Sequence, residues 1–217
     1  MSESTSQILL DKYADLYKRT VTHPLPKELC EGTLQDRALY IYLTQDLEFF
    51  ETGLRLICRV TSMCPEVPSL ITLAKKIGFF ASDENDYFRK CLSFLESELD
   101  KDTVKEIKDK KIIPGVDAYI DYLVELTKDQ RYDYPALISY LWCAEQCYLD
   151  WAHGLPKKEG LHWKHQTWID LHDGEHFITW CEFLRAEVDK FSVRQVEEVF
   201  AKTLQHEFNF FDSCYKA

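Results

Sequence analysis

The sequence predicts an all-α protein, a compact helical bundle, from three observations. Apolar residues recur at spacings of three and four rather than two, which is the period of a helix. Only seven Gly and seven Pro occur among 217 residues, too few for the many tight turns of a β-sandwich or barrel. A hydrophobic content of 46% is enough for a core. No internal repeat or low-complexity linker interrupts the chain, so we expect one domain over residues 1–217.

Local signals indicate where individual helices begin. Ser82 is followed by Asp, Glu and Asn, and Asp133 stands just before Tyr-Pro135, where a first helical turn accepts proline. Ser192-Val-Arg-Gln195 has the form of a capping box. Residues 101–112 form a shorter helix or a loop. The helices expected from these signals and the apolar spacing are 5–21, 34–62, 67–79, 83–99, 115–129, 134–153, 175–190 and 193–214.

The charge balance argues against two classes of partner. Lys and Arg number 26 and Asp and Glu 37, and the net charge of −11 repels phosphate backbones and anionic lipid. We therefore expect neither nucleic acid nor a membrane as partner. The polar start of the chain lacks the basic and apolar regions of a signal peptide, which favours the cytoplasm and leaves a nuclear fraction open. The eight cysteines contain no Cys-x-x-Cys pair, and we expect them to be reduced.

Three carboxylates fall inside the apolar stripes of three predicted helices. Asp46 has aromatic residues one turn away on both sides. Glu145 lies three residues after Trp142 and three before Tyr148. Glu207 lies within a stripe of leucine and phenylalanine. Because residues three or four apart share a helix face, each acid should point inward with its aromatic neighbours.

A buried isolated carboxylate is costly, so it finds a partner or becomes protonated. Three such acids on three helices would converge on one polar cavity in an apolar core, which suits a flat ligand that carries amino groups. Tyr119 adds a polar-tipped aromatic side chain on a further stripe. A purely structural role stays open for each acid alone: Asp46 would then pair with Arg55 or Arg59, and Glu207 with Tyr215.

The histidines give weaker signals. His172 and His176 have the i, i+4 spacing of metal ligands, but Gly174 intervenes and the stretch is not His-Glu-x-x-His. We therefore favour solvated or capping roles for both, and no metal site. The remaining chemistry-bearing histidines are expected in a loop (His162, His165) or at the surface (His206).

Cys143 and Cys147 are the cysteines nearest to these acids. Each is two residues from Glu145, which turns its side chain about 200° away around the helix. We therefore expect small buried hydrophobic residues here rather than nucleophiles.

Short stretches spread along the chain resemble the TenA (thiaminase II-like) family. The N-terminal part carries Thr22-His-Pro24, Glu31-Gly-Thr-Leu34 and Tyr42-Leu-Thr-Gln-Asp46 in the family's order. Later stretches that fit are Ala118-Tyr119-Ile-Asp-Tyr122, Tyr134-Pro-Ala-Leu, Trp142-Cys-Ala-Glu145-Gln-Cys-Tyr148 and Leu204-Gln-His-Glu207. The resemblance covers residues 8–214.

The central stretch Ser139-Tyr-Leu-Trp-Cys-Ala-Glu145 lacks the Pro-Cys pair of the cysteine-type enzymes, so the chain is similar to the glutamate-type, eukaryotic branch. The resemblance implies a bundle like that of haem oxygenase, a homo-oligomer (dimer or tetramer), and neither metal nor organic cofactor. It also implies an enzyme of thiamine salvage. That reaction hydrolyses 4-amino-5-aminomethyl-2-methylpyrimidine, or its N-formyl derivative, to the hydroxymethyl-pyrimidine.

The resemblance assigns roles to the predicted site residues. Glu207 would be the general base that activates water, Glu145 would handle the leaving amine, and Asp46 would bind the ring amino group. The side chains expected to contact the ring or to hold Glu145 are Phe49, Tyr119, Trp142 and Tyr148. Phe49 stands where many family members carry tyrosine, which would remove one hydrogen bond to the substrate.

Two other classes of function stay open. One is a non-catalytic binding protein or regulator for a thiamine-related ligand. The other is a metal-dependent protein on the same fold, which would need histidines beside the acids on the inner helix faces.

Overall fold

The computed structural model describes residues 3–110 and 112–217, and this part of the chain is helical and contains no strand, which confirms the predicted all-α fold. None of its helices is both long and apolar enough to cross a membrane. The elements are α1 (Thr5–Lys12), α2 (Ala14–Val21), α3 (Pro24–Glu31), α4 (Asp36–Met63), α5 (Val67–Phe79), the π-helix η1 (Phe80–Glu84), α6 (Asn85–Glu98), α7 (Lys101–Asp109), α8 (Pro114–Lys128), α9 (Tyr134–Gly154), α10 (Trp163–Leu171), α11 (Glu175–Val188) and α12 (Val193–Lys216).

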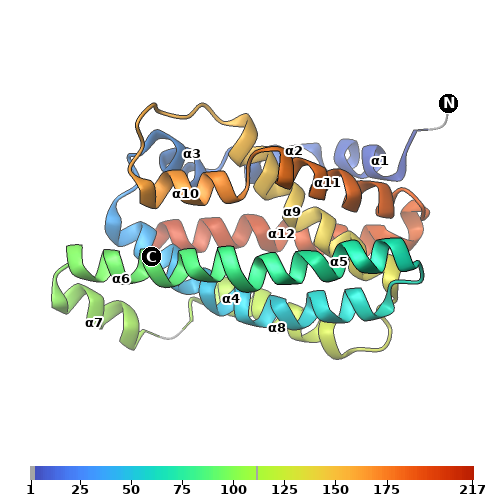
Figure 1. Cartoon of the computed structure of the whole chain (residues 1–217), viewed down its shortest axis with the longest axis horizontal. Coiled ribbons are helices and arrows are strands. Elements are labelled where there is room, and N and C mark those ends of the chain that lie inside the picture. Colours follow the sequence, from blue (N-terminus) through green and yellow to red (C-terminus); the bar gives the residue numbers. More distant parts are fainter. Residues whose placement is uncertain (1–2, 111) are drawn as a thin grey trace.

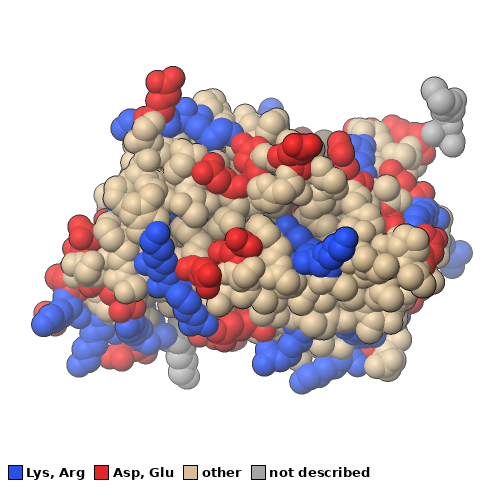
Figure 2. Space-filling model, in the orientation of Figure 1, with Lys and Arg blue, Asp and Glu red and all other residues tan. Residues whose placement is uncertain are grey.

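Helices α9 and α12 form the centre of the bundle. They pack against each other, and α11, α8, α4 and α2 pack around them. In Figure 1 the pair runs through the middle of the molecule, with α5 and α6 in front and α4 and α8 below. Helix α9 has buried residues around its whole circumference, as expected for a helix enclosed on all sides. Figure 2 shows acidic and basic side chains interspersed over the face that carries α5 and α6.

The predicted helix start at Ser82 is wrong. Helices α5 and α6 are joined without a break through the π-helix Phe80–Glu84, and Figure 1 shows them end to end. A π turn inserts one residue into the helical repeat, so the face that points inward changes at this point. Phe80 and Glu84 are thereby buried, whereas Ser82 is exposed and donates to the Gly78 carbonyl at 3.0 Å.

The N-terminal segment differs from the single predicted helix 5–21. It is broken at Tyr13 into α1 and α2, and a third short helix, α3, follows. The side chain of His23 caps α3 by accepting from the Leu25 N–H at 3.2 Å, and the helix ends at Gly32, whose φ of +67° favours glycine. Eight-residue helices with proline in the first turn give too little periodicity to stand out in the sequence.

Helix α10 is also absent from the sequence prediction, which placed His162 and His165 in a loop. His162 instead caps α10 by accepting from the Lys164 N–H at 3.3 Å, and His165 lies on the helix, 3% exposed. Between residues 101 and 112 the chain forms the helix α7, while residue 111 lies outside the described residues.

The longer helices begin and end close to the predicted residues. The capping box holds: the Ser192 N–H donates to Gln195 Oε1 at 3.1 Å. Asp133 caps α9 by accepting from the Ala136 N–H at 3.2 Å. All eight cysteines are free, as predicted.

Candidate active site

A cavity lies between α4, the π-helix, α6, α9, α10 and α12. It has a volume of about 90 Å³, and a single water needs roughly 10–15 Å³ on the same measure, so it is the size of a small heterocycle. Its wall is mostly aromatic and aliphatic, and all three predicted acids reach it. The lining residues are Asp46, Phe49, Phe50, Gly53, Leu54, Ile57, Phe80, Glu84, Phe88, Tyr140, Leu141, Ala144, Glu145, Tyr148, Trp168, His172 and Glu207.

Glu207 reaches the cavity from α12 and is 2% exposed. Its Oε1 accepts a hydrogen bond from the Tyr119 hydroxyl at 2.6 Å. Burial raises the pKa of Glu207 to about 8, and the negative charge of Glu145 adds to this while the bond from Tyr119 opposes it. The carboxyl group therefore exchanges its proton in the range where a general base works best.

Asp46 has the least satisfied carboxyl group of the cavity. It is 4% exposed, and its Oδ2 has no hydrogen-bond partner among the described residues. Burial raises its pKa well above the usual value, and the negative charges of Glu84 and Glu207 raise it further. A buried polar atom normally has a hydrogen-bond partner. The Asp46 oxygen lacks one, so it is available to bind a ligand.

Glu145 is bound on the side away from the cavity. The indole N–H of Trp180 on α11 donates to its Oε2 at 2.8 Å. Burial raises the pKa of Glu145 to about 7, while the positive charge of Lys76 lowers it. Lys76 on α5 is 8% exposed, and its ammonium lies over four aromatic rings, at 4.2 Å from Phe79 and 5.3 Å from Trp180.

Glu84 and His172 complete the polar part of the cavity. Glu84 comes from the π-helix and is 5% exposed, and His172 follows α10 and is 4% exposed. Glu84 Oε1 lies 3.4 Å from His172 Nε2, and His172 Nδ1 lies 2.8 Å from the Trp168 carbonyl oxygen. Of the two roles predicted for His172, solvated or capping, the structure shows capping, because His172 is the C-cap residue of α10; His176 is exposed as predicted.

Tyr148 lines the cavity but does not hold Glu145. Its hydroxyl lies 3.1 Å from the Tyr42 hydroxyl, which in turn accepts from the Trp168 indole N–H at 3.3 Å. The three aromatic side chains thus form a hydrogen-bonded chain along one wall, and Glu145 is held by Trp180 instead.

The three aromatic residues predicted to stack on a ligand lie in different places. Phe49 lines the cavity and packs on Tyr119, with ring centroids 4.7 Å apart. Tyr119 stands behind Glu207 and contributes its hydroxyl bond rather than a face of the cavity. Trp142 does not line the cavity: it stacks on Phe200 of α12, with centroids 5.3 Å apart. Trp142 is therefore corrected from a ligand contact to a core residue.

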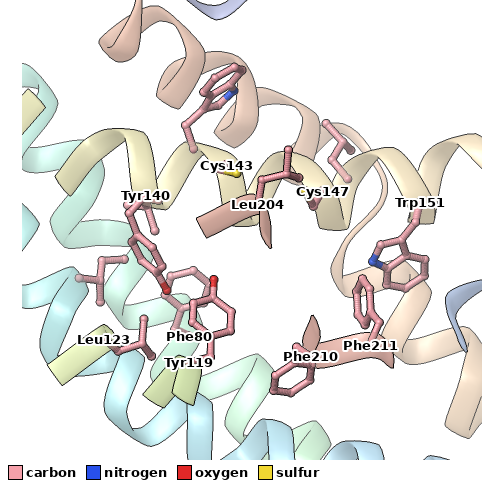
Figure 3. Close-up of a cluster of buried hydrophobic side chains, with 14 of the residues drawn as sticks. Phe80, Tyr119, Leu123, Tyr140, Cys143, Cys147, Trp151, Leu204, Phe210 and Phe211 are labelled. Carbon is pink, nitrogen blue, oxygen red and sulfur yellow. The ribbon is translucent and has the colours of Figure 1, made fainter. Parts of the chain in front are cut away.

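Cys143 and Cys147 face away from the cavity, as the helical geometry predicts. Both are fully buried, and the thiol of Cys143 lies 3.6 Å from the Phe200 carbonyl oxygen. Figure 3 shows both cysteines beside Leu204, while Tyr140 of the same helix points toward Tyr119. Burial raises the pKa of both thiols, so a thiolate is disfavoured there.

The structural alternatives for Asp46 and Glu207 are not observed. Arg55 donates to the Glu51 carbonyl oxygen, and Arg59 donates to the carbonyl oxygens of Leu126 and Tyr132. Tyr215 donates to Glu28 on the surface.

His206 is only partly exposed, because it is stacked between Tyr119 and Tyr122, with ring centroids 4.9 Å apart on each side. Its prediction as a surface residue is therefore only partly right.

The arrangement brings four carboxylates and one histidine to a chamber whose wall is mostly apolar. Such a chamber favours a cationic or amine-bearing ligand, and its acids are positioned for proton transfer. Residues 3–110 and 112–217 contain no group of three or more His, Cys, Asp or Glu side chains set to hold a metal ion. Glu84, Tyr140 and His172 also line the cavity, although their sequence patterns did not predict it. Glu84 lies in a Ser-Asp-Glu-Asn run that has the form of a helix start, and His172 stands out only by its spacing to His176.

Comparisons with known proteins agree with this fold. The sequence profile of the TENA/THI-4/PQQC family matches residues 10–217. No curated protein matches the chain significantly. The chain is similar to the solved structure of a TenA homologue from P. horikoshii OT3, with a TM-score of 0.77 at 17% identity over 99% of each chain.

Two further solved structures give the same result. A candidate TenA-like thiaminase from Sulfolobus solfataricus P2 has a TM-score of 0.77 at 17% identity, with 99% of this chain and 97% of that chain covered. A TenA family transcription regulator from Silicibacter sp. TM1040 has a TM-score of 0.76 at 16% identity, with 98% and 97% covered. At these identities the likeness concerns the fold.

Proposed function

The chain belongs to the TENA/THI-4/PQQC family, and from that premise we propose that it is a thiamine-salvage hydrolase. Its substrate would be 4-amino-5-aminomethyl-2-methylpyrimidine or the N-formyl derivative, and its product the hydroxymethyl-pyrimidine. The observation that carries the proposal is the unpartnered, buried Asp46 oxygen, which shares one heterocycle-sized cavity with Glu145 and Glu207.

The raised pKa of Asp46 suits recognition of an aminopyrimidine edge. That edge presents an amino donor beside a ring-nitrogen acceptor. A carboxyl group that holds one proton offers an acceptor and a donor side by side, so it makes both bonds at once. Phe49 and Phe50 line the cavity beside it and supply aromatic contacts to the ring.

The reaction then needs one base and one group for the leaving nitrogen. Glu207 takes a proton from water, the water oxygen bonds to the carbon, and the carbon–nitrogen electron pair moves to nitrogen, which takes up a proton from an acid in the cavity and leaves as ammonia. For the N-formyl derivative, water first attacks the formyl carbon, which releases formate and the aminomethyl compound, and the step above then converts that compound to the hydroxymethyl-pyrimidine. Glu145 accepts hydrogen bonds from the departing amine, and Tyr119 fixes Glu207 by its 2.6 Å bond.

The buried thiols support placing the chain in the glutamate-type branch. Cys143 and Cys147 lie outside the cavity lining, so no thiol stands beside the proposed water. Attack by water activated by Glu207 is then the simplest route.

Glu207→Gln tests the proposal, with Glu187→Gln as its matched control. Glu187 is equally buried, at 4%, but lies outside the cavity lining. We expect Glu207→Gln to lower kcat by about 10²–10⁴-fold, the usual contribution of a positioned base. Glu187→Gln should keep kcat, measured at a temperature at which it is folded. The readouts are chromatography of the hydroxymethyl product and enzymatic detection of ammonia or formate.

Wild-type protein that releases no product from either substrate contradicts the hydrolase. If it still binds the pyrimidine by calorimetry, a non-catalytic binding protein or regulator is the function instead. We also propose a cytoplasmic homo-oligomer, dimer or tetramer, which light scattering and cell fractionation test.

A further inference from the structure

Glu84 and His172 are in the cavity, yet the mechanism above does not use them. Both side chains line it, and both are more than nine-tenths buried. They come from parts of the chain far apart in sequence, the π-helix and the residue after α10. A π-helix at this point turns Glu84 inward, and the bond between His172 and Trp168 fixes the imidazole.

The hydrogen bond to Trp168 determines which nitrogen of His172 carries a proton. The Trp168 carbonyl oxygen can only accept, so His172 Nδ1 must be the donor in the 2.8 Å contact. In a neutral imidazole the other nitrogen, Nε2, then has a lone pair. That lone pair faces Glu84 Oε1 at 3.4 Å.

Two buried acceptors that face each other in a cavity with a mostly apolar wall repel. The repulsion disappears when one proton lies between them, either as imidazolium beside carboxylate or as imidazole beside carboxylic acid. In both forms the pair holds one proton that the cavity can use.

We propose that the Glu84–His172 pair is the acid that protonates the leaving nitrogen of the substrate. This inference rests on the proposed function and adds to it a proton donor separate from Glu207 and Glu145. The donor is needed when the leaving nitrogen arrives without a spare proton, as in an N-formyl group or a neutral amine.

The step balances with the pair as donor. The water oxygen bonds to carbon and its proton goes to Glu207. The carbon–nitrogen bond breaks, its electron pair moves to nitrogen, and the proton of the pair bonds to that nitrogen. A second proton transfer through water then returns the proton from Glu207 to the pair, so the enzyme ends in its starting state.

Several charged groups face the pair from the surrounding helices. They are Asp46 on α4, Lys76 on α5, Glu145 on α9 and Glu207 on α12. Glu84 and His172 both act electrostatically on Glu145, so the pair lies next to the group assigned to the amine. The three carboxylates attract an amine to this part of the cavity, and the pair offers the proton there.

The test compares two leaving groups on the same pyrimidine. Bound as the neutral amine, the aminomethyl compound needs a proton to release ammonia, whereas a trimethylammoniomethyl analogue releases neutral trimethylamine without one. Glu84→Gln keeps the shape and a hydrogen bond to Nε2 but removes the shared proton. We expect it to lower kcat for the aminomethyl compound by about 10²-fold or more, and to change the rate of the analogue by less than about threefold. His172→Asn, which retains an N–H for the Trp168 carbonyl, should behave in the same way.

The control is His176→Gln, an exposed histidine four residues further on, which should leave both rates unchanged. Equal losses for the two leaving groups would overturn the inference, because a general disturbance of the cavity affects both. So would an unchanged rate for the aminomethyl compound.

A spectroscopic measurement separates this inference from the proposed function and serves even if the analogue is not turned over. In protein labelled with [15N]histidine, a shared proton gives a far-downfield 1H resonance coupled to His172 Nε2, absent in Glu84→Gln. A free lone pair at Nε2 in the wild type at neutral pH contradicts the pair. If the wild type is inactive but shows the shared proton, the proposed hydrolase function is contradicted, while the shared proton of the Glu84–His172 pair is not.

Discussion

Two glutamates of this protein are almost equally buried and have opposite surroundings. Glu187 on α11 is 4% exposed and Glu207 on α12 is 2% exposed. Glu187 accepts from Ser69 at 2.6 Å, from Tyr134 at 3.0 Å and from the Lys190 ammonium at 2.7 Å. Within the described residues Glu207 accepts from Tyr119 alone, and it also lines the cavity.

The difference appears in their protonation. Burial, the largest influence on both, raises each pKa, but the bonds from Lys190, Ser69 and Tyr134 bring the pKa of Glu187 below its usual value. The pKa of Glu207 instead rises to about 8. Burial alone therefore does not mark a functional carboxylate. An acid that the fold leaves short of partners is free to bind and to exchange protons, whereas a fully bonded one joins helices.

Glu207→Gln should give the largest effect, a fall in kcat of about 10²–10⁴-fold together with a gain in stability at alkaline pH. The folded-state pKa of about 8 lies above the ordinary value of 4.5. The stability that this group contributes is therefore complete below pH 4.5 and is lost as the pH rises through about 8. Glutamine does not titrate, so the variant should gain free energy of unfolding, relative to wild type, between pH 5 and pH 9.

Urea unfolding at pH 5 and pH 9 measures this gain, with Glu187→Gln as the matched control. A stability difference that does not change with pH would mean that Glu207 is already ionised in the fold, and would remove the contrast between the two acids.

Glu187→Gln should have the second largest effect, on stability and not on activity. It weakens three hydrogen bonds to a charged acceptor, and such bonds contribute about 1.5–3 kcal/mol each. We expect a loss of about 2–3 kcal/mol in the free energy of unfolding at pH 7. Because the folded pKa is below 4.5, this contribution is present above that pH and fades as the pH falls through the folded pKa.

The measurement is the thermal midpoint at pH 7 and again under acid conditions, where the two proteins should converge. A loss of activity at a temperature at which Glu187→Gln is fully folded would show that this cluster also serves the site.

The sequence predicted the long helices and the three acids of the cavity, because both follow from helical spacing. Asp46, Glu145 and Glu207 stand out as carboxylates among apolar residues on a helix face. The same spacing gave a wrong prediction for Trp142 on α9. Because α9 is buried on all sides, its sequence pattern has no polar face that would show which residues point to α12 and which to the cavity, and Trp142 stacks on Phe200 of α12.

The other half of the site has no periodic signal. Glu84 sits in a polar run that resembles a helix start, and only the π-helix turns it inward. His172 follows a nine-residue helix, and its burial depends on packing between α10 and the π-helix. Irregular elements of this kind are determined by tertiary contacts, so the local spacing of residues in the sequence does not predict them.

Lys76→Met should give a smaller effect, because it changes the charge near Glu145 without touching the cavity wall. Lys76 is enclosed by aromatic rings and lowers the pKa of Glu145, which burial holds at about 7. Without the ammonium the pKa of Glu145 rises, and the acid limb of the kcat/KM profile should move to higher pH by about one unit. At a pH below the limb, kcat/KM should then be about tenfold lower than in wild type. Lys76→Arg should restore the wild-type limb.

The pH profile distinguishes this effect from a change in packing, which lowers the rate at every pH. An unshifted acid limb in Lys76→Met would mean that Glu145 does not need to be ionised in the rate-determining step.

Cys143→Ala should have the smallest effect on activity. It extends the comparison to a buried group that does not face the cavity. The thiol is fully buried between α9 and α12, on the side of α9 away from Glu145, and burial raises its pKa. A thiol that is both neutral and outside the cavity cannot attack a pyrimidine, so kcat should stay within about twofold of wild type. The lost sulfur leaves a small void that costs about 1 kcal/mol of stability. A fall in kcat comparable to that of Glu207→Gln would restore the covalent route that the geometry of α9 argues against, since only a nucleophile in contact with the substrate could produce it.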